Sequence, residues 1–366
     1  MFTSQVFKAI YFPDYKNINL KSKSLILAFG KKSKDLYNNI FDLESNEIRN
    51  LLGTDSYIEL EQRAKQEGLS VNTYCLWYLR KNLFTKEKKI TSKKERKEKP
   101  ISYFTNNVIK GDCLEVMREI PSKSIDMVLC DLPYGTTQNA WDSLIPLDLL
   151  WIQYERIIKD RGVIALTGQG VFTAKLILSN PKLFKYKITW VKSKPTNFLN
   201  AKKQPLRKHE DICIFYKKQP DYNPQMTYGE PYNKGFRKDQ LTGSYGDFKT
   251  VEVKSSGERY PTDVVYFKTA ESEGDVCHPT QKPIELGRYL IRTFTKEGNI
   301  ILDNTCGSGS FLISAVLEKR KFIGIEKNQE VYLFKKHRVN YIDVCKQRIK
   351  KAQEQNRIES SKVKLL

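Results

Sequence analysis

A strand, a glycine-rich loop and a helix in the last third of the chain constrain its fold most strongly. The apolar run 300–302 leads into a loop that contains Gly307 and Gly309, and a helical pattern follows at 311–317. Glycines in such a loop let the backbone approach a ligand closely at the N-terminus of the helix. This order of elements predicts an α/β fold, a doubly wound and mostly parallel sheet with a ligand site at the loop.

Two acidic residues flank this loop. Asp303 precedes it, and Glu326 ends the second apolar run, 322–325. An acid at the tip of the second strand is placed to accept hydrogen bonds from ribose hydroxyls. The loop has neither the third glycine of a dinucleotide fingerprint nor the lysine of a P-loop. It therefore favours a nucleoside-like ligand without a pyrophosphate.

A second candidate site follows the apolar run 125–130, which is nearly continuous and indicates a buried parallel strand. The tetrapeptide Asp131-Leu132-Pro133-Tyr134 comes directly after it. In an open α/β sheet, ligands bind at the carboxyl ends of the strands. A carboxylate and an aromatic ring there suit a planar ligand; the alternative is a simple turn with proline as a breaker.

Together these segments resemble an S-adenosylmethionine-dependent DNA amino-methyltransferase of the beta arrangement, in which the catalytic tetrapeptide precedes the cofactor loop. The resemblance covers about Asn107 to about Tyr341. The remaining motifs stand in the expected order, namely Gly111–Leu114, Trp190–Lys192, His209-Glu210 and His278–Pro283. The resemblance implies the Rossmann-like fold of a class I methyltransferase with a circularly permuted motif order.

The resemblance also implies a catalytic mechanism. The carboxylate of Asp131 and the backbone carbonyl of Leu132 would each bind one hydrogen of an exocyclic amine, which aims the nitrogen lone pair at the methyl group. The base must leave the duplex, and Tyr134 offers a face on which it stacks. Pro133 stiffens the loop; family members usually have a second proline where Leu132 stands. Aspartate in the first position favours adenine N6, whereas cytosine N4 enzymes more often carry serine.

The resemblance assigns the binding of S-adenosylmethionine to Asp112, Asp303, Thr305, Gly307, Gly309, Glu326, Lys282 and Pro283. Asp112 would hydrogen-bond the adenine of the cofactor, although it suits a helix N-cap equally well. The segment 278–283 would pack near the methionine end of the cofactor; its alternative is a helix start bounded by proline.

The charge balance is consistent with a DNA partner. The chain of 366 residues has 63 Lys and Arg against 42 Asp and Glu, a net charge of +21. Such a surplus favours a polyanionic partner, although a lysine-rich overall composition explains it about equally well. The connection 192–207 and the irregular insert 217–275, the target-recognition region in the resembled family, are the expected contacts with double-stranded DNA. The candidate residues are Lys192, Lys194, Asn197, Lys202, Lys203, Arg207, Arg237 and Lys238.

The domain organisation follows from composition and periodicity. Residues 1–85 predict a small helical accessory domain; its two helices are similar to the helical half of ribbon-helix-helix domains, but 50–55 does not alternate like their strand. Residues 86–104 predict a basic linker. The catalytic domain is predicted at 105–355, with its last helix at 331–352, and a polar tail at 356–366.

Metal and membrane sites are not expected. The seven cysteines are scattered, which favours reduced thiols and a cytoplasmic location, and the three histidines have no chelating spacing. No apolar run approaches the ~18 residues of a membrane span, and no export signal is visible.

The predicted function is site-specific methylation of a flipped adenine at N6, in a restriction–modification system or by an orphan or phage enzyme. A cognate endonuclease and a homodimer are partners by analogy. Alternatives are cytosine N4 methylation and, less favoured, RNA methylation. A nicotinamide-dependent oxidoreductase would need a third glycine, and intact Asp131 and Gly307 argue against an inactive DNA-binding protein.

Overall fold

The computed structural model describes residues 97–135, 144–237, 250–274, 276–327, 332–334 and 337–363, together with positions 58, 61, 62 and 65. The chain divides into two compact units, residues 1–95 and 96–366. The four isolated positions are helical and fall inside 57–67, the first helix expected in the accessory domain. The second helix expected there, 71–83, lies outside the described residues.

An eight-stranded sheet forms the body of the second unit, in the order β1-β12-β11-β2-β3-β5-β4-β10. Only β5 runs against its neighbours in this sheet. The doubly wound, mostly parallel sheet expected from the sequence is therefore confirmed. The strands are β1 (Asn107–Lys110), β2 (Ile125–Cys130), β3 (Ile158–Gly168), β4 (Phe184–Thr196), β5 (Arg207–Tyr216), β10 (Val264–Phe267), β11 (Ile300–Asp303) and β12 (Lys321–Glu326).

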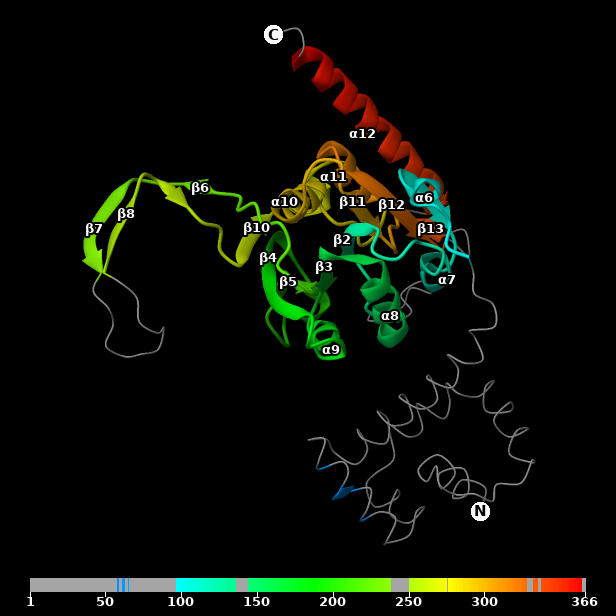
Figure 1. Cartoon of the computed structure of the whole chain (residues 1–366), viewed down its shortest axis with the longest axis horizontal. Helices are drawn as coiled ribbons and strands as arrows, with labels where there is room; N and C mark the ends of the chain where they lie inside the picture. The colour runs from blue at the N-terminus through cyan, green and yellow to red at the C-terminus, as the bar shows by residue number, and fades with distance from the viewer. Residues whose placement is uncertain are drawn as a thin grey trace. The chain divides into compact units, whose positions relative to one another are not determined.

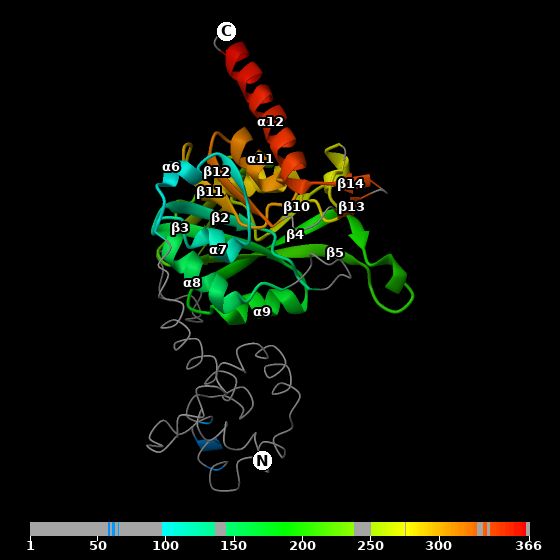
Figure 2. The same cartoon turned by 90° about the vertical axis from the view of Figure 1, so that its right-hand side faces the viewer.

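Helices cover both faces of this sheet (Figures 1 and 2). Met127 and Leu129 of β2 pack in one core cluster, whereas Val128 and Cys130 pack in the other. Because both faces of β2 are buried, its sequence is apolar except at Asp126, which pairs with Lys159 at 2.7 Å. The first cluster holds α10 (Ile284–Phe294), α11 (Ser310–Leu317) and the start of α12 (Tyr341–Val363); the second holds α6 (Ile101–Phe104), α7 (Cys113–Met117), α8 (Leu147–Ile157) and α9 (Val171–Ser179).

The two predicted loops meet because β2 and β11 are neighbours. Ile301 pairs with Met127, and Leu302 pairs with Val128, in parallel register. Asp131 and Asp303 therefore lie at the same edge of the sheet, where parallel strands present their carboxyl ends.

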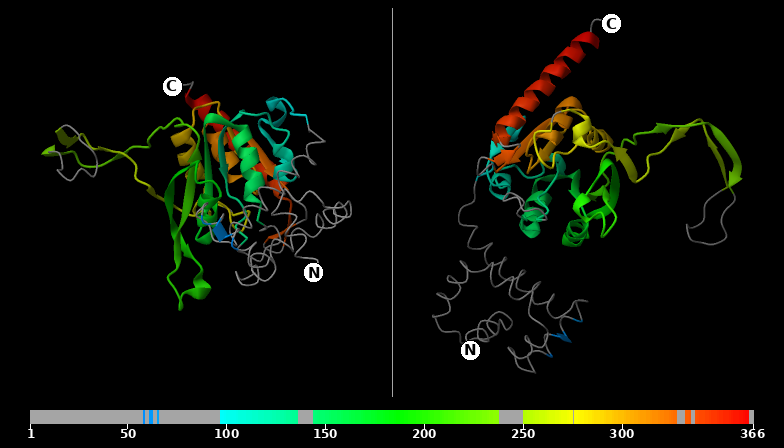
Figure 3. Two further views of the ribbon diagram at one scale, coloured as in Figure 1. Left: turned by 60° about the horizontal axis from the view of Figure 1, so that its bottom comes forward. Right: turned by 180° about the vertical axis from the view of Figure 1, so that it is seen from behind.

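The hairpin of β4 and β5 is longer than expected. The sequence predicted strands at 188–191 and 212–216 with a long basic loop between them, but β4 continues to Thr196 and β5 begins at Arg207. A short 3-10 helix, η1 (Phe198–Asn200), lies in the turn between them. Figure 3 shows the hairpin extending beyond the sheet to this turn.

The insert 217–275 is less irregular than its sequence indicated. It contains two small ladders, and its final strand, β10, joins the main sheet beside β4. Figure 1 shows the ladders as an arm. The first ladder pairs β6 (Thr227–Tyr228) with β9 (Glu258–Arg259), and the second pairs β7 (Tyr232–Arg237) with β8 (Val251–Ser255).

Three boundaries differ from the sequence prediction. The helix expected at 331–352 was wrong at its start, because β13 (Tyr332–Phe334) and β14 (His337–Val339) form a hairpin there. The helix α12 then continues through most of the expected tail, to Val363. Residues 97–104 belong to the catalytic unit, since Glu98 accepts hydrogen bonds from Ser122 and Arg156, both at 2.9 Å.

Within the described part of the chain, no helix is long and apolar enough to cross a bilayer. The described residues also contain no group of three His, Cys, Asp or Glu side chains that could hold a metal ion.

Candidate active site

A cleft of about 960 Å³ opens at the carboxyl edge of the parallel strands. Segments that follow β1, β2, β11 and β12 line it, and residues of the β4–β5 hairpin complete its wall. The tetrapeptide and the glycine loop thus share one cleft. The lining includes Asp112, Asp131, Leu132, Pro133, Tyr134, Lys192, Asn197, Arg207, Glu210, His278, Lys282, Asp303, Thr305, Gly307 and Glu326.

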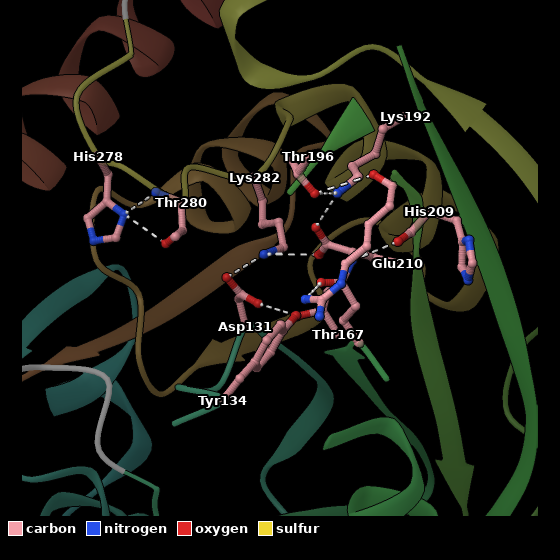
Figure 4. Close-up of polar contacts among 12 residues, drawn as sticks. Asp131, Tyr134, Thr167, Lys192, Thr196, His209, Glu210, His278, Thr280 and Lys282 are labelled. Carbon is pink, nitrogen blue, oxygen red and sulfur yellow. Dashed lines mark hydrogen bonds and ion pairs between the residues drawn. The ribbon is translucent and has the colours of Figure 1, made fainter. Parts of the chain in front are cut away.

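Hydrogen bonds hold the Asp131 carboxylate on both of its oxygens (Figure 4). Oδ1 accepts from the hydroxyl of Tyr134 at 3.0 Å and from that of Thr167 at a shorter distance. Oδ2 accepts from Lys282 Nζ at 2.7 Å. These bonds fix the side chain in position. Because it is 22 % exposed, it still faces the cleft.

Tyr134 is fixed from two directions. Its ring stacks on Phe172, with centroids 4.7 Å apart and planes inclined by 27°, and its hydroxyl also donates to Thr167 at 3.0 Å. Burial raises the pKa of Tyr134 well above its ordinary value, and the nearby charges of Asp131 and Glu210 add to that. The phenol is therefore a neutral donor, not a base.

Two lysines and a glutamate form a buried cluster beside Asp131. Lys282 Nζ lies 2.7 Å from Asp131 Oδ2 and 3.3 Å from Glu210 Oε2, and Lys192 Nζ lies 3.1 Å from Glu210 Oε1. Burial alone would lower the pKa of Lys282, but Asp131 and Glu210 outweigh it, so the pKa is raised. Burial would raise the pKa of Glu210, but the two lysines hold it below its ordinary value. Glu210 and Lys282 are therefore charged at neutral pH.

These contacts change the roles expected for the two lysines. Lys192 was predicted to contact DNA, but it is only 3 % exposed and its ammonium pairs with Glu210; a surface phosphate contact is thus wrong for it. Lys282 was predicted to bind the cofactor, yet its ammonium contacts the catalytic carboxylate. Pro283 is the N-cap of α10 and is not part of the cleft lining.

The glycine loop has the conformation that its sequence indicated. Gly307 and Gly309 have φ values of +49° and +82°, in the left-handed region. A Cβ at Gly309 would collide with the sulfur of Cys345, so the position requires glycine for space as well as for conformation. Glu326 Oε2 accepts the backbone N–H of Gly307 at 2.8 Å, which ties the end of β12 to the loop.

Thr305 joins the glycine loop to the tetrapeptide. Its hydroxyl donates to the backbone carbonyl of Asp131 at 2.9 Å and lies 2.9 Å from Cys130 Sγ. Its backbone N–H donates to Asp303 Oδ1 at 3.3 Å. The side chain thus fixes the two loops relative to each other.

Asp112 and His278 line the same cleft. Asp112 is the N-cap of α7, where Oδ1 accepts from the N–H of Leu114 at 3.0 Å, so the capping interpretation is confirmed. Its other oxygen lies 3.2 Å from Lys327 Nζ. Burial, together with the charges of Lys282 and Arg348, lowers the pKa of His278 to about 4, so this imidazole is neutral at pH 7.

The acidic groups of the cleft fit a cationic nucleoside better than a phosphate ligand. Three acids, Asp112, Asp303 and Glu326, lie around the glycine loop. Burial raises the pKa of Asp303 to about 8, and the charges of Asp131 and Glu326 act in the same direction. A ligand with hydroxyls and a positive charge complements these acids, as S-adenosylmethionine would.

The remaining candidate DNA contacts lie mainly on the β4–β5 hairpin. Lys194, Lys202, Lys203 and Arg207 are exposed there, and Asn197 begins the η1 turn in the left-handed conformation. Arg237 is the last residue of β7, and Lys238 lies outside the described residues.

Sequence reasoning missed Thr167 and gave no role to Glu210. Thr167 follows Leu166, which pairs with Cys130 in the parallel register of β2 and β3, so it lies beside Asp131. Glu210 faces the same edge because β5 runs antiparallel and pairs Asp211 with Gly168. A prediction of the strand register would have found both residues.

The fold and the cleft define a doubly wound α/β enzyme that binds its ligand at the carboxyl ends of parallel strands. The chain belongs to the DNA methylase family, whose model matches residues 125–354. It is therefore an enzyme that methylates DNA.

Individual relatives are similar over most of the catalytic unit. A type II methyltransferase, M2.MboI of Moraxella bovis, is 27 % identical over 64 % of this chain and 88 % of its own length. The DNA adenine methyltransferase YhdJ of Escherichia coli is 27 % identical over 61 % of this chain and 79 % of its own. The crystal structure of the M1.HpyAVI-SAM complex has a TM-score of 0.45 at 20 % identity, covering 66 % of this chain and 98 % of that one.

Proposed function

We propose that this protein transfers a methyl group from S-adenosylmethionine to the exocyclic N6 amine of adenine in double-stranded DNA. The observation that carries the proposal is the fixed Asp131 carboxylate, which faces the cleft next to the glycine loop. The aspartate in the first position of the tetrapeptide and the similarity to an adenine methyltransferase favour adenine. Cytosine N4 is the second candidate, since its amine has the same donor geometry.

The acids around the glycine loop are the proposed cofactor ligands. Asp303 and Glu326 would bind its polar groups, and Gly307 and Gly309 leave space for it beside the backbone. Asp112 would accept from its adenine with the oxygen that does not cap α7. When bound there, S-adenosylmethionine supplies an electrophilic methyl group on a sulfonium.

The tetrapeptide would prepare the target amine. This nitrogen is a weak nucleophile because its lone pair is delocalised into the ring. If the Asp131 carboxylate and the Leu132 carbonyl each accept one amine hydrogen, the nitrogen becomes pyramidal and its lone pair points away from the ring plane. Asp131 also stabilises the positive charge that develops on nitrogen. The neutral His278 is not required as a base in this scheme.

The target base must leave the duplex to reach the cleft. Tyr134, held in plane by Phe172, offers the stacking surface. The β4–β5 hairpin would contact the DNA backbone through Lys194, Lys202, Lys203 and Arg207. Its turn also exposes Phe198 and Leu199, which are 76 % and 83 % exposed and suit contact with unstacked bases.

The arm between β5 and β10 is the proposed target-recognition region. Its exposed aromatic side chains include Tyr228, Phe236 and Tyr260, at 80 %, 73 % and 73 % exposure. Exposed aromatic rings beside basic residues such as Lys234 suit a nucleic-acid surface. By analogy, the enzyme would act in the cytoplasm as a homodimer, with or without a cognate endonuclease.

Incubation with labelled S-adenosylmethionine and unmethylated genomic DNA or RNA tests the proposal. We expect label in N6-methyladenine from DNA. Label in N4-methylcytosine would overturn the assignment to adenine, and label in RNA alone would overturn the DNA substrate. We expect Asp131→Ala to abolish transfer while cofactor binding, measured by calorimetry, persists; loss of both would make Asp131 a structural residue.

A further inference from the structure

The hydrogen bonding of Glu210 is incomplete in a place where it bears on catalysis. The side chain is 14 % exposed, and Oε1 accepts from Lys192 Nζ at 3.1 Å. Lys282 Nζ lies 3.3 Å from Oε2, but it is not aligned on this oxygen, which accepts no hydrogen bond from the residues that the structure describes. A buried carboxylate oxygen without a donor is costly, so it calls for an explanation.

Lys282 directs its hydrogen bond to Asp131 instead, at 2.7 Å from Oδ2 (Figure 4). This contact opposes the proposed chemistry. An ammonium on Asp131 neutralises the carboxylate that should stabilise positive charge on the target amine, and it occupies a position where the amine must donate. The Lys282 side chain is 9 % exposed, so water does not screen the effect strongly.

The cluster offers the ammonium a second position. Glu210 Oε2 is within ion-pair distance of the same Nζ atom and has an unfilled acceptor. A small shift of the lysine side chain would exchange the bond to Asp131 for a bond to Glu210. The two carboxylates and the two lysines sum to zero charge, so the shift redistributes charge within the cluster without creating an unpaired ion.

We propose that Glu210 is a positioning residue, which takes over the ammonium of Lys282 when the target amine engages Asp131. In the free enzyme Lys282 holds the catalytic carboxylate in its orientation. In the substrate complex its hydrogen bond moves to Glu210 Oε2, and Asp131 becomes available to the amine. Lys192 holds the other oxygen of Glu210 and keeps the acceptor in place. This inference rests on the proposed function, since it concerns the same amine.

The test uses Glu210→Gln, which keeps the shape of the side chain but removes its charge. The cluster then carries one excess positive charge, and Lys282 stays on Asp131. We expect the single-turnover rate of methyl transfer to fall by about 10- to 100-fold, the range typical of a misplaced catalytic group. Cofactor affinity, measured by calorimetry, should change by less than about twofold, because no proposed cofactor ligand is altered.

Asp211→Asn is the matched control. Asp211 is the next residue of β5, is 6 % exposed, and pairs with Lys187 at 2.7 Å and with Thr173 at 3.0 Å. It is a buried carboxylate of the same strand that does not line the cleft. Its substitution should lower stability at least as much as Glu210→Gln but leave the transfer rate within about twofold of the wild type.

A second substitution separates charge from structure. In Glu210→Gln/Lys282→Met the excess positive charge is gone, so we expect the double variant to be faster than Glu210→Gln alone. A purely structural role predicts the opposite, because two defects in one buried cluster would add. A wild-type rate for Glu210→Gln, or a double variant slower than the single one, would overturn the inference. If the wild type methylated no DNA, the proposed function would fail instead.

Discussion

Replacement of Thr305 by valine tests whether this side chain serves the cofactor or the tetrapeptide. Valine keeps the shape and removes the hydroxyl that donates to the Asp131 carbonyl at 2.9 Å. The carbonyl then loses a partner at a partly buried position beside the cleft. The loss of a hydrogen bond at such a position costs about 0.5–1.5 kcal/mol, so the free energy of unfolding should fall by about this amount.

The effect on catalysis should be larger than the effect on cofactor affinity. The lost bond connects the glycine loop to the backbone that carries Asp131 and Leu132, and small displacements of reacting groups cost up to about 100-fold in rate. We expect the single-turnover rate of Thr305→Val to fall about 10- to 100-fold, equivalent to about 1.4–2.7 kcal/mol. Cofactor affinity, measured by calorimetry, should fall by less than about threefold.

Thr305→Ser is the control, because it keeps the hydroxyl and loses only a methyl group. Its rate should stay within a factor of about three of the wild type. The reasoning would be refuted if Thr305→Val lost cofactor affinity while its transfer rate at saturating cofactor stayed normal. That outcome would return Thr305 to the cofactor ligands.

Three further predictions concern the glycine loop, the buried acid and the hairpin. Gly309→Ala should lower the free energy of unfolding by about 2–4 kcal/mol, because of the left-handed φ and the collision with Cys345. The control Gly298→Ala, at φ +79° in open space, should lower it by about 1–2 kcal/mol. Denaturant titrations measure both values, and equal costs would contradict the collision. Burial raises the pKa of Asp303 from 3.8 to about 8, so the folded protein binds more protons than the unfolded chain in this window and the group's contribution to stability falls as pH rises through it. The urea midpoint of Asp303→Asn minus that of the wild type should therefore increase as the pH is raised from about 5 to about 8.5. A difference that stays constant with pH would refute the pKa shift. Lys202→Ala should weaken DNA binding uniformly across sequences and reduce the slope of log affinity against log salt by about 1, as binding titrations would show; an unchanged slope would remove it from the phosphate contacts.

The parts of the site that lie on parallel strands were predictable from the sequence. Apolar strands with both faces buried, such as β2 and β11, have a distinctive sequence, and their carboxyl ends must meet at one edge. This places Asp131, Asp303 and Glu326 together before any coordinates are known. The loop glycines were predictable for a different reason, since only glycine readily adopts their backbone conformation and fits the space available.

The charged cluster was not predictable in the same way. The sequence shows that Lys192 and Lys282 are basic, but not that their ammonium groups are buried, because burial depends on side-chain direction at the ends of β4 and α10. A lysine near a DNA-binding loop was therefore assigned to phosphate, whereas Lys192 pairs with Glu210. The antiparallel register of β5 decides this pairing, and it has no local sequence signal.

Irregular segments gave the remaining errors. The short strand β10 follows a long insert and contains only Val264–Phe267, so nothing in its length indicates that it joins the main sheet. Likewise, the hairpin of β13 and β14 lies in a stretch whose apolar residues also fit helical spacing.

The order of strands in the sheet has a consequence for synthesis on the ribosome. β1 and β2 both emerge early, but their partners β12 and β11 are encoded after the arm, and Asn106 bonds Phe322 across 216 positions of the chain. Until those late strands leave the exit tunnel, β1 has no partner and β2 keeps one edge unpaired, and unpaired strand edges are prone to aggregation and proteolysis. A nascent or truncated chain that stops within the arm therefore has no complete cleft, so methylation begins only after β11 and β12 have been translated.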